Sequence, residues 1–264
     1  MTYQALEHAR VRKHLLLLSA MAWVLLLNGS DIARMPAHCP TMSAGAMPLS
    51  ASFRMLLTMN PPASLAAGWA LMLVAMMPPV LMAPVLYIRL CSFAHRRARS
   101  TALFITGYAA IWMALGGVLV GIELAVKSIA LPRFVPAAGV VLLALIWQFS
   151  PVKQRCLNRC HAHPNLAAFG FAADFDALSF GVTHGIWCAG SCWALMLCPM
   201  LLPHGHIAAM AGAAALIFSE RLEQAMPPCW RWRGLGKVTR IVVAQAQIRL
   251  HALQVRRVPS TSGA

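Results

Sequence analysis

Residues 184–202 read His-Gly-Ile-Trp-Cys-Ala-Gly-Ser-Cys-Trp-Ala-Leu-Met-Leu-Cys-Pro-Met-Leu-Leu, and this stretch decides the fold class. It holds no Asp, Glu, Lys or Arg, and about 20 mostly apolar residues suffice to cross the hydrocarbon core of a bilayer. The whole chain has the same character, with 59% hydrophobic residues, 11% charged residues and a mean hydropathy of +0.66. Soluble domains contain about 25% charged residues. The composition therefore predicts an all-α, polytopic membrane bundle.

Six apolar segments are predicted to span the membrane. They cover residues 15–33, 65–90, 102–124, 134–149, 185–202 and 207–219. The first is interpreted as an uncleaved anchor, because it lacks a convincing small-x-small cleavage site. Pro78, Pro79 and Pro84 lie inside the second, so that helix should be kinked or broken. Two small-xxx-small patterns, Gly117/Gly121 and Gly181/Gly185, would permit close helix contacts.

The distribution of basic residues predicts the orientation. If the N-terminus is cytoplasmic, 18 of the 22 Lys and Arg residues lie on the inner side and four on the outer side. This bias predicts a bacterial inner-membrane protein with both termini inside. We expect residues 1–230 to form the transmembrane domain and residues 231–264 a basic, amphipathic cytoplasmic tail. Such a tail favours anionic lipid of the inner leaflet as a partner, rather than nucleic acid.

Two cysteine pairs with i, i+4 spacing are the main candidate metal ligands, together with nearby histidines. These residues are Cys156, Cys160, Cys188, Cys192 and His184, with His161 and His163 as secondary candidates. The spacing places both sulfurs of a pair on one helix face. If the fourth and fifth spans form an antiparallel hairpin, all four thiols could meet at its inner end, where cysteines stay reduced. Neighbouring Arg155 and Arg159 could favour thiolates. The alternative is that the cysteines are small apolar packing residues.

Methionines extend this set of soft ligands. Met196 and Met200 continue the four-residue spacing of His184, Cys188 and Cys192, and such a stripe could pass a soft cation along the helix. Nine of the 16 methionines lie between positions 35 and 82. A second, outer cluster is therefore predicted from Met72, Met76, His38, Cys39 and Met42. Thioethers favour Cu(I) over Zn(II), although methionine also serves as a polarizable filler of cores.

No catalytic residues are predicted. The sequence contains no phosphate-binding glycine loop, HExxH motif or GxSxG nucleophile elbow, so we do not expect an enzyme. Glu220 and Glu223 are interpreted as interfacial ion-pair partners of Arg221 or of the basic loop. Asp174 and Asp176 are expected to be solvated in the inner loop.

Several of these stretches together resemble a bacterial family of predicted metal-binding integral membrane proteins, whose members are sometimes described as copper chaperones. The matching stretches are WALMLVAMMP at 69–78, GYAAIW at 107–112, WQFSPVKQRCLNRC at 147–160, HGIWCAGSCWALM at 184–196 and the region of Glu220. They cover most of residues 60–225. The family often has Cys-x-Gly-Cys-Cys-Trp where this chain has Ser191 before Cys192, so an identical ligand set is not implied.

The leading hypothesis is a membrane protein that binds Cu(I), with zinc as the alternative metal. It would buffer copper or deliver it to a membrane or periplasmic copper protein. A metal transporter using the fifth span is the second hypothesis, and a structural accessory subunit of a larger membrane complex is the third.

Overall fold

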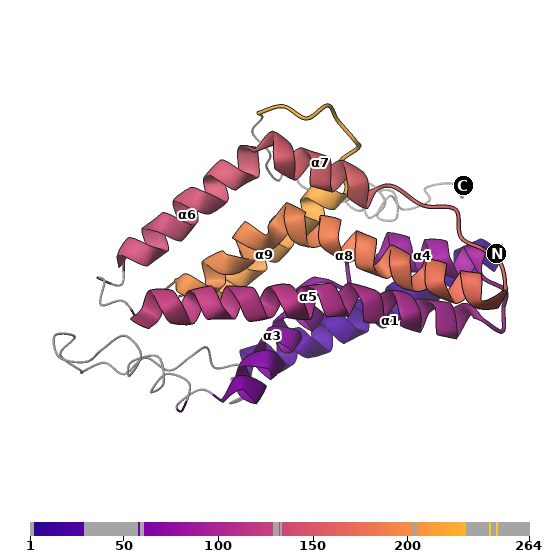
Figure 1. The fold of residues 1–264 in the computed structure, drawn as a ribbon, viewed down its shortest axis with the longest axis horizontal. Helices are drawn as coiled ribbons and strands as arrows, with labels where there is room; N and C mark the ends of the chain where they lie inside the picture. The colour runs from indigo at the N-terminus through magenta and orange to yellow at the C-terminus, as the bar shows by residue number, and fades with distance from the viewer. Residues whose placement is uncertain are drawn as a thin grey trace, which may run out of the picture.

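The computed structural model describes residues 3–28, 61–128, 134–202 and 205–230, together with positions 58, 132, 243 and 247. The predicted outer ligands His38, Cys39 and Met42 lie outside these residues, as does nearly all of the predicted tail. Within the described residues the fold is helical and contains no strand, as predicted. The helices are α1 (Tyr3–Leu27), α3 (Pro62–Met76), α4 (Met82–Cys91), α5 (Arg97–Ser128), α6 (Phe134–Phe149), α7 (Pro151–Cys160), α8 (Gly170–Leu201) and α9 (His206–Arg221) (Figure 1).

The prediction of six membrane spans is wrong for the described residues. By length and apolar composition, only α5 and α8 are able to cross a bilayer, with a third span if α6 and α7, bent by 65°, count as one. The second segment is divided into α3 and α4, each too short alone, by a break that contains Pro78 and Pro79. Helix α9 is also short, with 16 residues, and α1 carries charges through its first half. Prolines therefore divide the second predicted span, and the charges of α1 leave only its second half apolar.

Helix α8 lies at the centre of the bundle, where it packs against α5, α6, α7 and α9. Its longest contact is with α5, and the two helices run side by side in Figure 1. Glycines permit this approach: a Cβ at Gly107 would lie 2.6 Å from the Leu178 carbonyl oxygen, and one at Gly181 would collide with the backbone of Phe104. Gly117 has no such neighbour. Only one of the two small-residue patterns is therefore used in packing within the described part of the chain.

Ion pairs tie several helices together at one end of the bundle. Glu7 of α1 pairs with Arg89 of α4 at 3.0 Å, and Asp174 of α8 pairs with Arg96 at 2.6 Å and Arg99 at 2.7 Å. The expectation of a solvated Asp174 in a loop is therefore wrong. Helix α8 begins at Gly170, well before the predicted start of the span, because paired carboxylates are tolerated in its first turns.

Helix α7 carries the cysteine pair Cys156/Cys160, whose spacing predicted a shared helix face. Ser150 separates it from α6 and caps it by accepting a hydrogen bond from the Val152 amide at 3.0 Å, with Pro151 in the first turn. These are typical signals of a helix start. The bend turns the polar helix α7 across α8, with its cysteines on the buried side.

Candidate metal centre

The four cysteines of the predicted hairpin lie on the two sides of the α7–α8 interface. All four are buried: Cys156 and Cys160 are each 7% exposed, Cys192 is 1% exposed and Cys188 is fully enclosed. The Cys156 sulfur fills the space left by Gly190 of α8, where an added Cβ would lie 3.0 Å from Sγ. The sequence spacing and the close approach at Gly190 thus direct both cysteine pairs toward one interface.

Cys188 is the fully enclosed member of the four and also contacts a third helix. Its sulfur lies 3.3 Å from the hydroxyl of Tyr108, a residue of α5. Cys192 donates its thiol hydrogen to the Cys188 carbonyl at 3.0 Å, and Ser191 donates to the same carbonyl at 2.7 Å. Ser191, which stands where the resembling family often has a thiol, is therefore engaged with its own helix.

Arg221 at the end of α9 is the cation beside the thiols. Its guanidinium hydrogen-bonds the Cys160 sulfur, lies within electrostatic reach of Cys188, and donates to the Ser191 hydroxyl at 3.4 Å. The expectation that Arg155 and Arg159 supply this charge is wrong, since Arg155 is exposed and the Arg159 guanidinium lies over the Trp187 ring.

Burial controls the protonation of the two α7 thiols. Burial raises the pKa of Cys160 to about 12, although the Arg221 guanidinium acts in the opposite direction. Burial also raises the pKa of Cys156, again against the effect of Arg221. Both thiols therefore carry their protons at neutral pH and must release them to become strong metal ligands.

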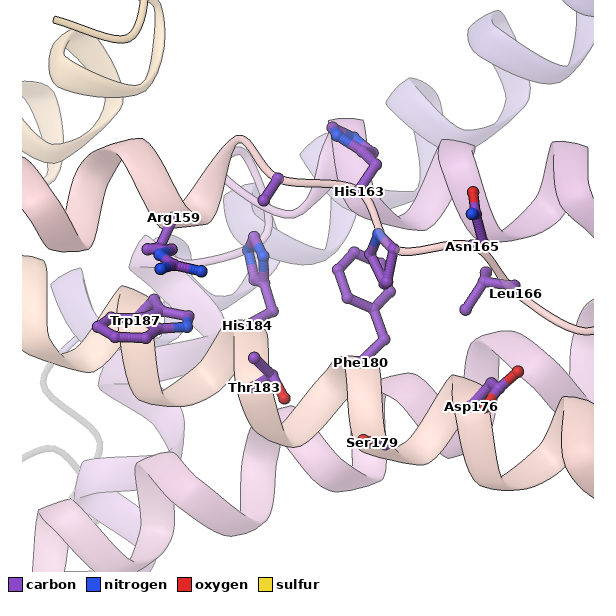
Figure 2. A pocket seen from close by; sticks show the side chains of 12 residues that line it. Arg159, His163, Asn165, Leu166, Asp176, Ser179, Phe180, Thr183, His184 and Trp187 are labelled. Atoms are coloured by element: carbon purple, nitrogen blue, oxygen red, sulfur yellow. The ribbon is translucent and has the colours of Figure 1, made fainter.

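His184 lies one turn before Cys188 and borders a pocket of about 260 Å³ (Figure 2). The residue is 4% exposed, and neither ring nitrogen has a hydrogen-bond partner. Its ring packs instead among those of Phe104, Tyr108 and Phe180, with centroids 5.9, 6.0 and 5.8 Å away. The two free nitrogens make it the buried side chain best placed to accept a further ligand.

The two loop histidines have different surroundings. His161 faces two backbone carbonyls, with Nδ1 2.9 Å from that of Leu157 and Nε2 3.2 Å from that of Arg221. It therefore lies between the end of α7 and the end of α9. His163 is exposed on the pocket wall, where its ring meets Tyr87 edge-on at 4.6 Å.

The methionine candidates are buried. Met196 and Met200 continue the buried face of His184, Cys188 and Cys192 along α8. Met72 and Met76 lie in the core on α3. The other outer candidates, His38, Cys39 and Met42, lie outside the described residues.

A buried polar cluster lies beside the thiols. Glu220 pairs with Lys153 at 2.8 Å, and Gln148 bonds both, accepting from Lys153 at 2.5 Å and donating to Glu220. The expected pairing of Glu220 with the basic loop is confirmed. Sequence reasoning missed the burial of Lys153 and the roles of Gln148, Tyr108 and Arg221, although all four lie in the stretches that carry the family resemblance.

The thiols do not form a closed metal site in this conformation. Across the described segments, no three His, Cys, Asp or Glu side chains are arranged to hold one ion together. The cysteine side chains approach the same interface from α7 and α8. At least one of them, Cys192, donates a hydrogen bond to a backbone carbonyl of its own helix. Rotation of these side chains is needed before several of them bind one ion.

A family model described as "PpoB2: Copper chaperone" matches residues 66–244, about two thirds of the chain. The match confirms the resemblance seen in the sequence. It also agrees with the expectation that this protein is not an enzyme, because copper chaperones are metal-handling proteins. No curated protein and no solved structure matches the chain.

Proposed function

This chain belongs to the PpoB2 copper-chaperone family, and from that premise we propose that it carries Cu(I) between α7 and α8 and delivers it to a membrane or periplasmic copper protein. Copper here is cargo. The proposed ligands are Cys156, Cys160, Cys188, Cys192 and His184.

The observation that carries the proposal is the convergence of four buried thiols on one helix interface. Soft sulfur and imidazole donors favour Cu(I), which accepts two or three such ligands. His184 offers a further metal ligand, because neither of its ring nitrogens is hydrogen-bonded within the protein. A dry, enclosed set of donors also restricts access of oxidants and water to the metal.

Charge balance supports a monovalent ion. One Cu(I) bound by two thiolates carries a net charge of −1, which a single neighbouring guanidinium offsets. Arg221 occupies that position next to Cys160 and Cys188. A Zn(II) ion with four thiolates would carry −2 and leave one negative charge uncompensated in an apolar interior, which is costly.

The membrane location is part of the proposal. It is supported by helices α5 and α8, which are long and apolar enough to span a bilayer. The C-terminal basic tail would then contact anionic lipid.

The test is purification without oxygen, loading with Cu(I) under a competing chelator, and measurement of bound metal by mass spectrometry. We expect bound copper in the wild type and its loss when Cys156, Cys160, Cys188 and Cys192 are all changed to Ser. Elution of each variant as a single peak in detergent controls for folding. A wild type without copper, or a quadruple variant with the wild-type amount, would refute the site.

The buried face of α8 supports transport as a second candidate. His184, Cys188, Cys192, Met196 and Met200 follow one another at four-residue steps, all buried. At 1.5 Å per residue this face covers about 24 Å, most of the hydrocarbon thickness. Copper flux into proteoliposomes that disappears in the double variant Met196→Leu, Met200→Leu would favour transport over chaperoning.

A further inference from the structure

We propose that the pocket beside His184 is the port at which Cu(I) arrives on a small anionic thiol carrier, with Arg159 binding the carrier's carboxylate and His184 receiving the metal. The inference rests on the proposed function and adds the chemical class of the donor. Figure 2 shows the arrangement: Arg159 and Trp187 lie at one end of the pocket, Asp176 lies at the other, and His184 lies between them.

The buried end of the pocket presents an unused ligand. A neutral imidazole has one N–H donor and one acceptor nitrogen, and leaving such groups buried without partners destabilises the folded protein. In His184 both are buried and unbonded while the ring borders the pocket. A Cu(I) ion that reaches the ring from the pocket would bond the unprotonated nitrogen directly and so remove the part of this cost that comes from it.

The size of the pocket indicates more than a bare ion. Its volume of about 260 Å³ is several times the ~30 Å³ that one water occupies in the liquid. The residues that line it include the aromatic Trp187 and Phe180 and the polar Ser179 and Thr183. This lining suits a small peptide-like molecule that brings the metal with it.

The charges set the sign of that molecule. Among the described residues no carboxylate pairs with Arg159, whose guanidinium lies 5.7 Å from the Trp187 ring centroid. Asp176 is already engaged, because it accepts the Ala167 amide hydrogen at 2.8 Å. An anionic carrier is therefore attracted to the Arg159 end, where a guanidinium binds carboxylate in a fork geometry.

One helical turn of α8 separates His184 in the pocket from the first buried thiol. Cys188 follows His184 at i+4 on the same buried face of α8, and Tyr108 contacts both residues. In the transfer, the bond between Cu(I) and the carrier sulfur breaks as a bond to His184 and then to the Cys188 sulfur forms. The departing carrier thiolate takes up the proton that the accepting thiol releases, and no electron is transferred.

The test compares two copper sources of opposite charge in stopped-flow loading of the full-length protein. One is the anionic complex of Cu(I) with reduced glutathione, a carboxylate-bearing tripeptide thiol, and the other is the cationic acetonitrile complex. We expect Arg159→Gln to slow loading from the glutathione complex about tenfold or more and to leave loading from acetonitrile unchanged. Arg155→Gln is the matched control, because Arg155 is exposed on the same helix and does not line the pocket.

A second variant tests the pocket without altering charge. Thr183→Trp fills the pocket, whereas Ile186→Trp adds the same ring to an exposed position of α8 outside it. We expect slower glutathione-dependent loading only in Thr183→Trp, with the final copper content equal in both. Equal slowing from both sources by Arg159→Gln, or no slowing by Arg159→Gln and Thr183→Trp, would overturn the port. A wild type that takes copper from neither source would instead overturn the proposed function.

Discussion

Lys153 and Glu220 form an ion pair of 2.8 Å in which the lysine side chain is fully enclosed and the glutamate side chain is 2% exposed. The pair joins α7 to α9, and Gln148 at the end of α6 bonds both members. Breaking a buried pair by removing one charge leaves the other uncompensated, whereas replacing the whole group by apolar residues often costs little.

The first prediction follows from this asymmetry. Glu220→Gln should lower the free energy of unfolding by about 3–5 kcal/mol, because the buried Lys153 charge loses its ion pair with the Glu220 carboxylate. The triple variant Gln148→Leu, Lys153→Met, Glu220→Leu should lose less than the single one. Thermal unfolding in detergent measures both, and a single variant as stable as the wild type would contradict the role given to the pair.

The second prediction concerns which cysteines matter on α8. Cys188→Ser should remove most bound copper, while Cys198→Ser should retain it. Cys198 lies on the same helix but bonds only the Ala194 carbonyl, outside the thiol interface. Metal content after gel filtration compares the two, and equal loss in both variants would place the ligands elsewhere.

The third prediction is a pH dependence of loading. Burial raises the pKa of Cys156, and that of Cys160 to about 12, so both thiols are protonated at pH 7 and each must lose a proton to bind as thiolate. Apparent affinity should therefore rise with pH between 6 and 8, by about tenfold per pH unit for each proton released. Calorimetry in buffers of different ionisation enthalpy counts these protons, and an affinity independent of pH would show that the α7 thiols do not bind.

The fourth prediction tests the packing of α5 on α8. Gly181→Ala should destabilise the protein by about 1–3 kcal/mol, because the added Cβ would overlap backbone atoms of Phe104. Unlike the end of a flexible side chain, these atoms cannot move aside unless the helix itself shifts. Gly117→Ala should be neutral or slightly stabilising, since nothing lies near its Cβ position. Urea or thermal unfolding of both variants measures the difference, and equal stability would argue against the close approach.

Local patterns predicted much of the fold. Helix α6 has the predicted bounds, residues 134–149, because its sequence is a nearly continuous apolar run. The break between α3 and α4 lies at the prolines that predicted it. The i, i+4 spacing predicted correctly that each cysteine pair shares a helix, and the buried thiols do lie on a common interface.

Partners distant in the sequence explain the rest. In the sequence alone, the charge of Asp174 suggests a solvated loop. In the structure Asp174 lies in a helix, because Arg96, 78 positions earlier, pairs with its carboxylate. Arg221 has no local pattern that connects it with Cys160, because only the packing of α9 brings them together. The number of spans was overestimated because each apolar segment was counted as a span, although prolines divide the second segment and α9 has only 16 residues.

The position of Arg221 also has a consequence for biosynthesis. The guanidinium beside the thiols comes from the last described helix, whereas all four cysteines precede it in the chain. A nascent chain that has not yet docked α9 presents these cysteines without their counter-charge and without the Lys153–Glu220 link. Synthesis order thus makes completion of the thiol environment depend on α9, the last of the described helices to be made, docking onto α7 and α8.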